Sequence, residues 1–191
     1  MTATRVDAGL EALAAAALAS KALSQRVGAV AGRYADVLRK GGTLFFCGNG
    51  GSAADAQHLA TEYVVRYAKT RRPLAAVALT TDSSLLTAAG NDLGFEQIFA
   101  RQVEALCRPG DLLILHSASG RSPNLIAAAV AARGQSVGTV AFLGQGGGPL
   151  AAEVDEALLV PSSETSQIQV IHLALEHCIV EIVEEELTRP A

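Results

Sequence analysis

Five short apolar segments that alternate with helix-like segments restrict the fold of this chain more than any other feature. The apolar segments are residues 43–47, 74–79, 112–116, 137–143 and 157–160. Unbroken apolar runs of this length are typical of strands buried on both faces, and intervening helices are typical of parallel strand connections. The sequence therefore predicts an α/β fold in which helices cover both faces of a parallel sheet.

The remaining segments predict helices. Residues 5–39 are rich in Ala and Leu and contain no proline, which favours one long or two shorter helices ended by Gly41 and Gly42. Further helices are expected over residues 52–68, 83–89, 95–107, 122–133 and 164–187. No repeat or linker interrupts the pattern. We therefore expect one domain over residues 1–191, with an N-terminal helical extension (1–40) and an α/β core (41–191) that ends in the C-terminal helix.

Composition excludes several classes of function. The chain has 191 residues and a net charge of −4, so we do not expect the basic surface that nucleic-acid binding requires. The apolar run near the N-terminus is too short, and too closely flanked by charged residues, for a signal peptide or membrane span. The three cysteines have no C-x-x-C spacing and lie in apolar stretches, which predicts reduced, buried thiols. A cytoplasmic protein without nucleic-acid or membrane partners is expected.

Two serine-bearing loops occupy equivalent positions after strands. Residues 48–52 (GNGGS) follow the first predicted strand, and residues 117–122 (SASGRS) follow the third. Each loop opens a helix, so it carries free backbone N–H groups and the positive end of a helix dipole. Ligands bind beyond the carboxyl ends of parallel strands, so the loops predict a site for a phosphate ester. The candidate phosphate-binding residues are Asn49, Gly50, Gly51, Ser52, Ser117, Ser119 and Ser122.

His58 and Glu62 lie four residues apart on the helix that begins at the first serine loop. This spacing places their side chains on one face, one turn apart. Such a pair suits two ligands of one metal ion, or a ligand beside a catalytic base. A surface ion pair with no function has the same spacing. The helix begins at a predicted phosphate loop, so the His58–Glu62 pair lies about two helical turns from the predicted anion, which favours a functional role.

A second cluster of polar residues lies in the C-terminal helix, at Gln169, His172, Glu176 and His177. His172 and Glu176 also stand four residues apart, so spacing does not select the functional histidine. Gln169 and His177 are separated by a rise of roughly 12 Å along a regular helix. If both bind one metal ion, either the helix is distorted or two chains contribute. Each histidine, considered alone, also suits a packed core position.

Other residues have two interpretations. Residues 90–92 (GND) predict a turn followed by a helix, where Asn91 and Asp92 cap the helix or contact a sugar hydroxyl. His116 precedes Ser117 and either faces the site or acts as a spacer. Asp82 is expected to be solvated or to cap a helix.

The C-terminal helix also carries an apolar stripe at helical spacing. The stripe comprises Ile168, Leu175, Ile179 and Ile182. It packs either on the domain's own sheet or in a helical bundle shared between subunits, and we expect an oligomer.

Four segments together resemble a known family. They are residues 47–62, 87–95 and 117–122, together with the I-Q-x-x-H-x-x-x-x-H pattern of residues 168–177. These segments are similar to those of the phosphoheptose isomerases, which are sedoheptulose 7-phosphate isomerases of the sugar isomerase (SIS) domain superfamily. The resemblance runs from about Gly41 to Leu187, and its most specific part is residues 47–62.

The resemblance implies a fold, an assembly and a reaction. The fold would be a five-stranded parallel sheet in a flavodoxin-like three-layer arrangement, assembled as a homotetramer with active sites near subunit interfaces. One Zn²⁺ per subunit would be held by His58, Glu62, Gln169 and His177. Sedoheptulose 7-phosphate would be converted to D-glycero-D-manno-heptose 7-phosphate through an enediol. Glu62 would act as base and His177 as its acid–base partner.

The chain departs from the family pattern at four positions. Ala118 replaces a Thr, and Arg121 replaces an Asn, within the second serine loop. Gln167 and Val170 replace an Arg and a Glu near the expected metal ligands. These changes leave open an isomerase of another phosphosugar. A non-catalytic SIS protein that binds the replication initiator is a further alternative, although that branch typically lacks the terminal histidine.

Overall fold

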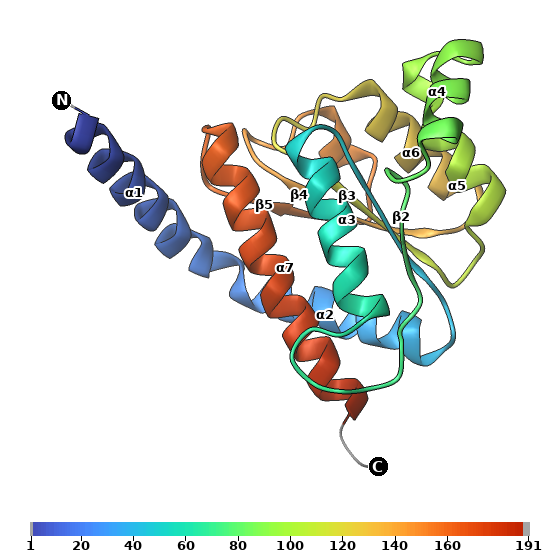
Figure 1. Cartoon of the computed structure of the whole chain (residues 1–191), viewed down its shortest axis with the longest axis horizontal. Coiled ribbons are helices and arrows are strands. Elements are labelled where there is room, and N and C mark those ends of the chain that lie inside the picture. Colours follow the sequence, from blue (N-terminus) through green and yellow to red (C-terminus); the bar gives the residue numbers. More distant parts are fainter. Residues whose placement is uncertain (1, 189–191) are drawn as a thin grey trace.

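A parallel sheet of five strands forms the centre of the structure, a computed structural model that describes residues 2–188 (Figure 1). The strands are β1 (Leu44–Gly48), β2 (Ala76–Ala78), β3 (Leu112–Ser117), β4 (Gly138–Leu143) and β5 (Glu156–Leu159). Their order across the sheet is β2-β1-β3-β4-β5, and each neighbouring pair is parallel. The predicted α/β fold is confirmed.

Helices precede, connect and follow the strands. The α-helices are α1 (Thr2–Ala19), α2 (Ser24–Arg39), α3 (Gly51–Val64), α4 (Ser83–Asp92), α5 (Ala100–Leu106), α6 (Pro123–Gly134) and α7 (Thr165–Thr188). Short 3₁₀ helices are η1 (Ser20–Leu23), η2 (Phe95–Gln97) and η3 (Pro149–Ala152). The predicted N-terminal helical region thus consists of two α-helices joined by a 3₁₀ turn.

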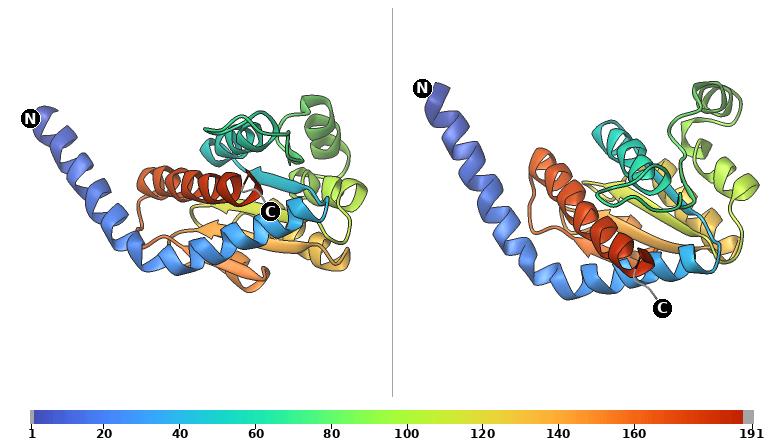
Figure 2. Two further views of the ribbon diagram at one scale, coloured as in Figure 1. Left: turned by 90° about the horizontal axis from the view of Figure 1, so that it is seen from below. Right: turned by 60° about the horizontal axis from the view of Figure 1, so that its bottom comes forward.

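The two faces of the sheet have separate apolar cores, because successive residues of a strand point to opposite sides. Phe46 and Ile114 pack with α2, α3 and α7 on one face. Phe45 and Leu113 pack with α4, η2, α5 and α6 on the other. Figure 2 shows the resulting three layers, with α7 and α3 side by side over the sheet.

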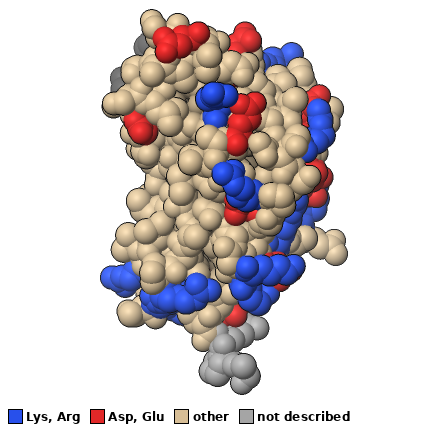
Figure 3. Space-filling model, turned by 90° about the vertical axis from the view of Figure 1, so that its right-hand side faces the viewer, with Lys and Arg blue, Asp and Glu red and all other residues tan. Residues whose placement is uncertain are grey.

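Helix α1 extends away from the rest of the chain (Figures 1 and 2). Val6, Leu10 and Leu18 are each more than half exposed on it. On the face drawn in Figure 3, Lys and Arg side chains gather toward the lower end, with wide uncharged areas above. Among the described helices, none is both long and apolar enough to cross a membrane.

Some local predictions were wrong. Residues 90–92 do not form a turn before a helix; they are the last residues of α4. The helix predicted over residues 95–107 is divided into η2 and α5, which bury Ile98 and Phe99 at the junction. Cys47 and Cys107 are buried as expected, but Cys178 is exposed. Helical geometry turns Cys178 outward although the next residues, Ile179 and Val180, are buried.

Candidate functional site

The two serine loops lie side by side at the centre of the sheet. β1 and β3 are neighbouring parallel strands, and the helices that follow them, α3 and α6, lie on opposite faces. The chain therefore reverses its direction of winding between these strands. Open α/β sheets bind ligands at this switch point, outside the carboxyl ends of the strands.

A pocket of about 180 Å³ lies where the loops meet. Its lining residues are Asn49, Ser52, His116, Ser117, Ala118, Ser119, Ser122, Thr165 and Gln169. Asn49 of the first loop and Asn124, in the first turn of α6 after the second loop, are joined by reciprocal amide hydrogen bonds of 2.9 and 2.8 Å. The pocket thus brings together the serines of both predicted phosphate loops, and it offers the hydroxyl and amide groups that an anion requires.

Hydrogen bonds within the second loop fix its backbone. Ser117 Oγ accepts a hydrogen bond from the Gly120 N–H at 3.0 Å, and Ser119 Oγ accepts one from the Arg121 N–H at 3.3 Å. Each hydroxyl keeps its own proton to donate to a ligand. Gly120 has φ +62°, and a Cβ there would lie 1.8 Å from the Gly147 carbonyl oxygen. The loop therefore requires glycine at this position.

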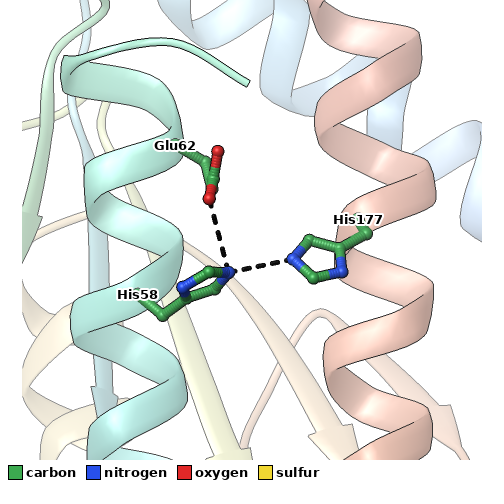
Figure 4. A group of neighbouring side chains, drawn as sticks. All are labelled: His58, Glu62 and His177. Atoms are coloured by element: carbon green, nitrogen blue, oxygen red, sulfur yellow. Dashed lines mark hydrogen bonds and ion pairs between the residues drawn. The ribbon is translucent and has the colours of Figure 1, made fainter. Parts of the chain in front are cut away.

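A cluster of titratable side chains lies between α3 and α7 (Figure 4). His58 and Glu62 extend from α3 toward His177 on α7. His58 Nε2 lies 2.9 Å from His177 Nε2 and 3.4 Å from Glu62 Oε1. Ser52 and His58 share α3, and the rise between them is about 9 Å. The cluster and the serine-lined pocket, called the anion pocket below after the ligand that the sequence predicts, are thus separated along the helix by a distance that a phosphorylated sugar can bridge.

The donor set of this cluster suits a metal ion. One ligand atom from each of His58, Glu62 and His177 lies within 4.8 Å of the others. Two imidazoles and a carboxylate are common ligands of Zn²⁺, and three protein ligands leave a further position open, as in catalytic zinc sites. The residues present therefore fit the zinc ion that the family resemblance implies.

Arg71 and Glu184 connect α3 and α7 on the C-terminal side of the cluster. Glu184 on α7 accepts hydrogen bonds from Arg71 Nε at 3.0 Å and from the N–H groups of residues 67–69. Arg71 donates to the carbonyls of Glu62 and Tyr63 at 2.7 and 2.9 Å. Burial disfavours the charged Glu184, but these donors outweigh burial and lower its pKa. Both side chains are nearly inaccessible to solvent.

The structure separates the two histidines that spacing could not rank. His172 is fully buried against the sheet, whereas His177 is partly exposed beside Tyr67, whose ring stacks on it at 5.6 Å. Burial, with a smaller contribution from His116, lowers the pKa of His172 to about 3. His172 is therefore neutral at pH 7 and lies outside the cluster. Its partner in spacing, Glu176, is also fully buried.

Three predicted site residues lie away from the cluster within one chain. The Gln169 amide lies in the anion pocket against Gly51, and among the described residues it makes no hydrogen bond to His58, Glu62 or His177. Asn91 and Asp92 are exposed at the end of α4, where Asn91 Nδ2 donates to Asp92 Oδ1 at 2.7 Å. Asp92 borders a separate, mostly apolar pocket of about 340 Å³ between α4 and α5.

Sequence reasoning missed Asn124, Tyr67, Arg71 and Glu184. Each acts through a contact with a residue distant in the sequence, and no local spacing indicates such a contact. Asn124 had one available signal, since it lies two residues after the second serine loop and at the start of a predicted helix.

Known proteins resemble this chain over most of its length. A sequence profile described as the SIS domain matches residues 11–144. The phosphoheptose isomerase of Roseiflexus sp. (strain RS-1) is 54% identical over 159 residues, which are 83% of this chain and 81% of that protein. The phosphoheptose isomerase of Aquifex aeolicus (strain VF5) is 51% identical over 162 residues, which are 85% of each chain.

Solved structures agree with these matches. The structure of a phosphoheptose isomerase from Neisseria gonorrhoeae has a TM-score of 0.92 and 39% identity, covering 97% of this chain and 100% of that one. One from Francisella tularensis also has a TM-score of 0.92, with 32% identity, covering 97% of this chain and 99% of that one. This chain belongs to the phosphoheptose isomerase family of SIS-domain proteins.

Proposed function

We propose that this chain is an aldose–ketose isomerase that converts sedoheptulose 7-phosphate to D-glycero-D-manno-heptose 7-phosphate. The phosphoheptose isomerases named above support the substrate, since they cover most of this chain at about half identity. The observation that carries the chemistry is the meeting of Glu62 and His177 from separate helices, near a pocket lined by serines. A carboxylate and an imidazole are suited to the two proton transfers that the isomerisation needs.

The phosphate group would bind in the pocket between the serine loops. Ser52, Ser119 and Ser122 each offer a hydroxyl, and the N-termini of α3 and α6 add backbone N–H groups and positive dipole ends. The sugar chain would then run along α3 toward the cluster. This placement fixes the phosphate at one end of the substrate and leaves the carbonyl end free to react.

The proton transfers follow from the two catalytic groups. The Glu62 carboxylate removes a proton from C1 of the ketose while His177 donates a proton to the carbonyl oxygen at C2, giving the enediol. Glu62 then returns the proton to C2, and His177 accepts the proton from the hydroxyl at C1, giving the aldehyde. Atoms balance because each group recovers its starting protonation state.

A zinc ion is proposed as the cofactor, one per subunit, held by His58, Glu62 and His177. When bound, it supplies a Lewis acid that polarises the oxygens of the sugar. Neither Glu62 nor His177 can hold the ion tightly and transfer a proton through the same atom at once, so metal binding and proton transfer by these residues belong to different stages of turnover. Gln169 lies in the anion pocket, so its expected role as a further ligand requires a second subunit.

We also propose that the chain forms a homotetramer with active sites near subunit interfaces. Helix α1 extends from the body with exposed Val6, Leu10 and Leu18, which would be covered in an assembly. Val65 and Val170 are also exposed, on the elements that carry the cluster. A neighbouring subunit could also bring Asn91 and Asp92 to a site. Light scattering after size-exclusion chromatography measures the assembly directly.

A turnover assay tests the function. Purified protein with Zn²⁺ is expected to convert sedoheptulose 7-phosphate, and a panel of other ketose phosphates determines whether Ala118 and Arg121 have changed the preferred substrate. Glu62→Gln and His177→Ala should each abolish turnover without changing the oligomeric state. Gln135→Ala, a change at a partly buried position at the end of α6 on the other face of the sheet, serves as the control. Full activity in either cluster variant would refute the mechanism.

A further inference from the structure

A buried polar contact connects the two halves of the proposed site. His116 lies on β3 immediately before Ser117, the first residue of the second serine loop. Glu176 lies on α7 immediately before His177. The His116 Nε2 and Glu176 Oε1 atoms are 3.2 Å apart, and both side chains are completely buried. A single contact therefore joins the strand that positions the anion pocket to the helix turn that positions the cluster.

The neighbours of this contact leave it little freedom. The His116 ring lies between Phe46 and Phe142, nearly parallel to both at 17°, with ring centroids 6.4 and 5.2 Å away. The Tyr34 hydroxyl of α2 donates a hydrogen bond to the same Glu176 oxygen at 3.2 Å. Consecutive residues of a helix project about 100° apart, so Glu176 faces the sheet while His177 faces α3. Moving Glu176 would therefore move His177.

Stability does not account for this arrangement. Burying a titratable pair costs desolvation energy, and well-packed apolar residues of similar volume are often equally stabilising or more so. Among the described residues, Glu176 Oε2 and His116 Nδ1 are buried without hydrogen-bond partners. Each such atom lowers stability further. Folding energy is therefore a weak reason for a polar contact at this position.

We propose that His116, Glu176 and Tyr34 are positioning residues that fix the separation between the anion pocket and the His58–Glu62–His177 cluster. Because the phosphate is held at one end and the carbonyl reacts at the other, this separation determines which length of sugar phosphate is accepted. The inference rests on the proposed function and deepens it by assigning chain-length selectivity to a contact between two completely buried side chains.

The test replaces all three polar residues with apolar groups of similar shape. In the triple variant Tyr34→Phe/His116→Phe/Glu176→Leu, the ring at position 116 still fits between Phe46 and Phe142, and none of the three replaced groups leaves a buried polar partner. We expect the stability to urea to be unchanged or higher. The kcat for sedoheptulose 7-phosphate should fall about 10- to 100-fold, because small displacements of reacting groups have effects of this size.

The selectivity readout separates positioning from a structural role. The ratio of kcat/KM for the seven-carbon ketose phosphate to that for five- and six-carbon ketose phosphates should shrink in the triple variant. Glu176→Gln preserves side-chain length and the accepting oxygen, so it should retain most of the selectivity. Gln102→Met removes a buried polar group from the opposite core, where Gln102 bonds the carbonyls of Leu79 and Ile98. This control should change stability but leave selectivity unchanged.

Binding measurements keep the inference independent of turnover. The triple variant should bind Zn²⁺ at least tenfold more weakly by calorimetry, as is common when a residue that orients a metal ligand is lost. If the wild-type chain isomerises no ketose phosphate, the proposed function fails, but this loss of zinc affinity still tests the inference. If the triple variant does not fold, His116→Phe/Glu176→Gln, whose amide still accepts from Tyr34, is measured in the same way. Wild-type kcat, selectivity and zinc affinity in a folded variant would overturn the proposal.

Discussion

Acidification should destabilise the fold through His172. This ring is fully buried, and its pKa falls from 6.5 to about 3, chiefly because burial disfavours the charged form. The unfolded chain exposes the ring, so between these pH values the unfolded state binds a proton that the folded state does not. The free energy of unfolding therefore decreases as the pH falls below about 6.5.

The size of the effect follows from the pKa difference. Each pH unit below 6.5 removes about 1.4 kcal/mol of unfolding free energy, until the pH reaches the pKa in the folded state. Lowering the pH from 7 to 5 should therefore remove about 2 kcal/mol through this group alone. The whole range down to pH 3 corresponds to about 5 kcal/mol.

Urea unfolding of the wild-type chain and of His172→Leu isolates this contribution. At pH 7 the variant should be about as stable as the wild type, because the buried ring is neutral there and, within the part of the chain that the structure describes, neither ring nitrogen has a hydrogen bond of good geometry. Between pH 7 and 5 it should lose about 2 kcal/mol less than the wild type. Phe142→Leu, at a ring that contacts His172 edge-on, should lower stability at both pH values but keep the wild-type pH dependence. Equal pH losses in the wild type and His172→Leu would refute the assignment.

Three further predictions concern stability and the serine loop. Arg71→Met removes the counter-ion of the buried Glu184 carboxylate, leaving only its backbone N–H donors, and should lower the free energy of unfolding in urea by about 3–5 kcal/mol. Arg133→Met, at an exposed ion pair, should cost less than about 1 kcal/mol. Asp82→Ala removes the side chain that accepts the Leu85 N–H at the start of α4 and should cost about 1 kcal/mol by thermal denaturation; an unchanged melting temperature would contradict this cap. Gly120→Ala should weaken competitive inhibition by inorganic phosphate, because the added methyl group collides with the backbone at residue 147; an unchanged inhibition constant would show that the loop does not bind phosphate.

The sequence pattern predicted the fold closely because strand burial and helix periodicity are local properties. All five predicted strand segments overlap a strand, but β2 is only Ala76–Ala78 within the predicted residues 74–79. β2 is at the edge of the sheet and pairs only with β1, so fewer of its residues meet the pairing geometry. The break between η2 and α5 follows from burial of Ile98 and Phe99, which periodicity alone did not indicate.

The site was harder to predict than the fold. Local spacing offered two histidine–carboxylate pairs at the same interval, and only the orientation of α7 distinguishes them. His177 meets α3, whereas His172 and Glu176 face the sheet. Spacing also suggested that Gln169 and His177 stand far apart if their helix is regular. The helix is uninterrupted between them, because α7 is continuous over Thr165–Thr188.

The buried ion pair of Arg71 and Glu184 has a consequence for the mobility of the neighbouring backbone. The amides of residues 67–69 belong to no helix or strand, yet all three donate to one inaccessible carboxylate. The exchange of these amide protons with deuterated solvent should be as slow as in a helix interior. Breaking their hydrogen bonds would leave the buried Glu184 carboxylate without donors and without water. Conformational fluctuations during turnover would then occur in other segments of the chain, while residues 67–69 would keep their position.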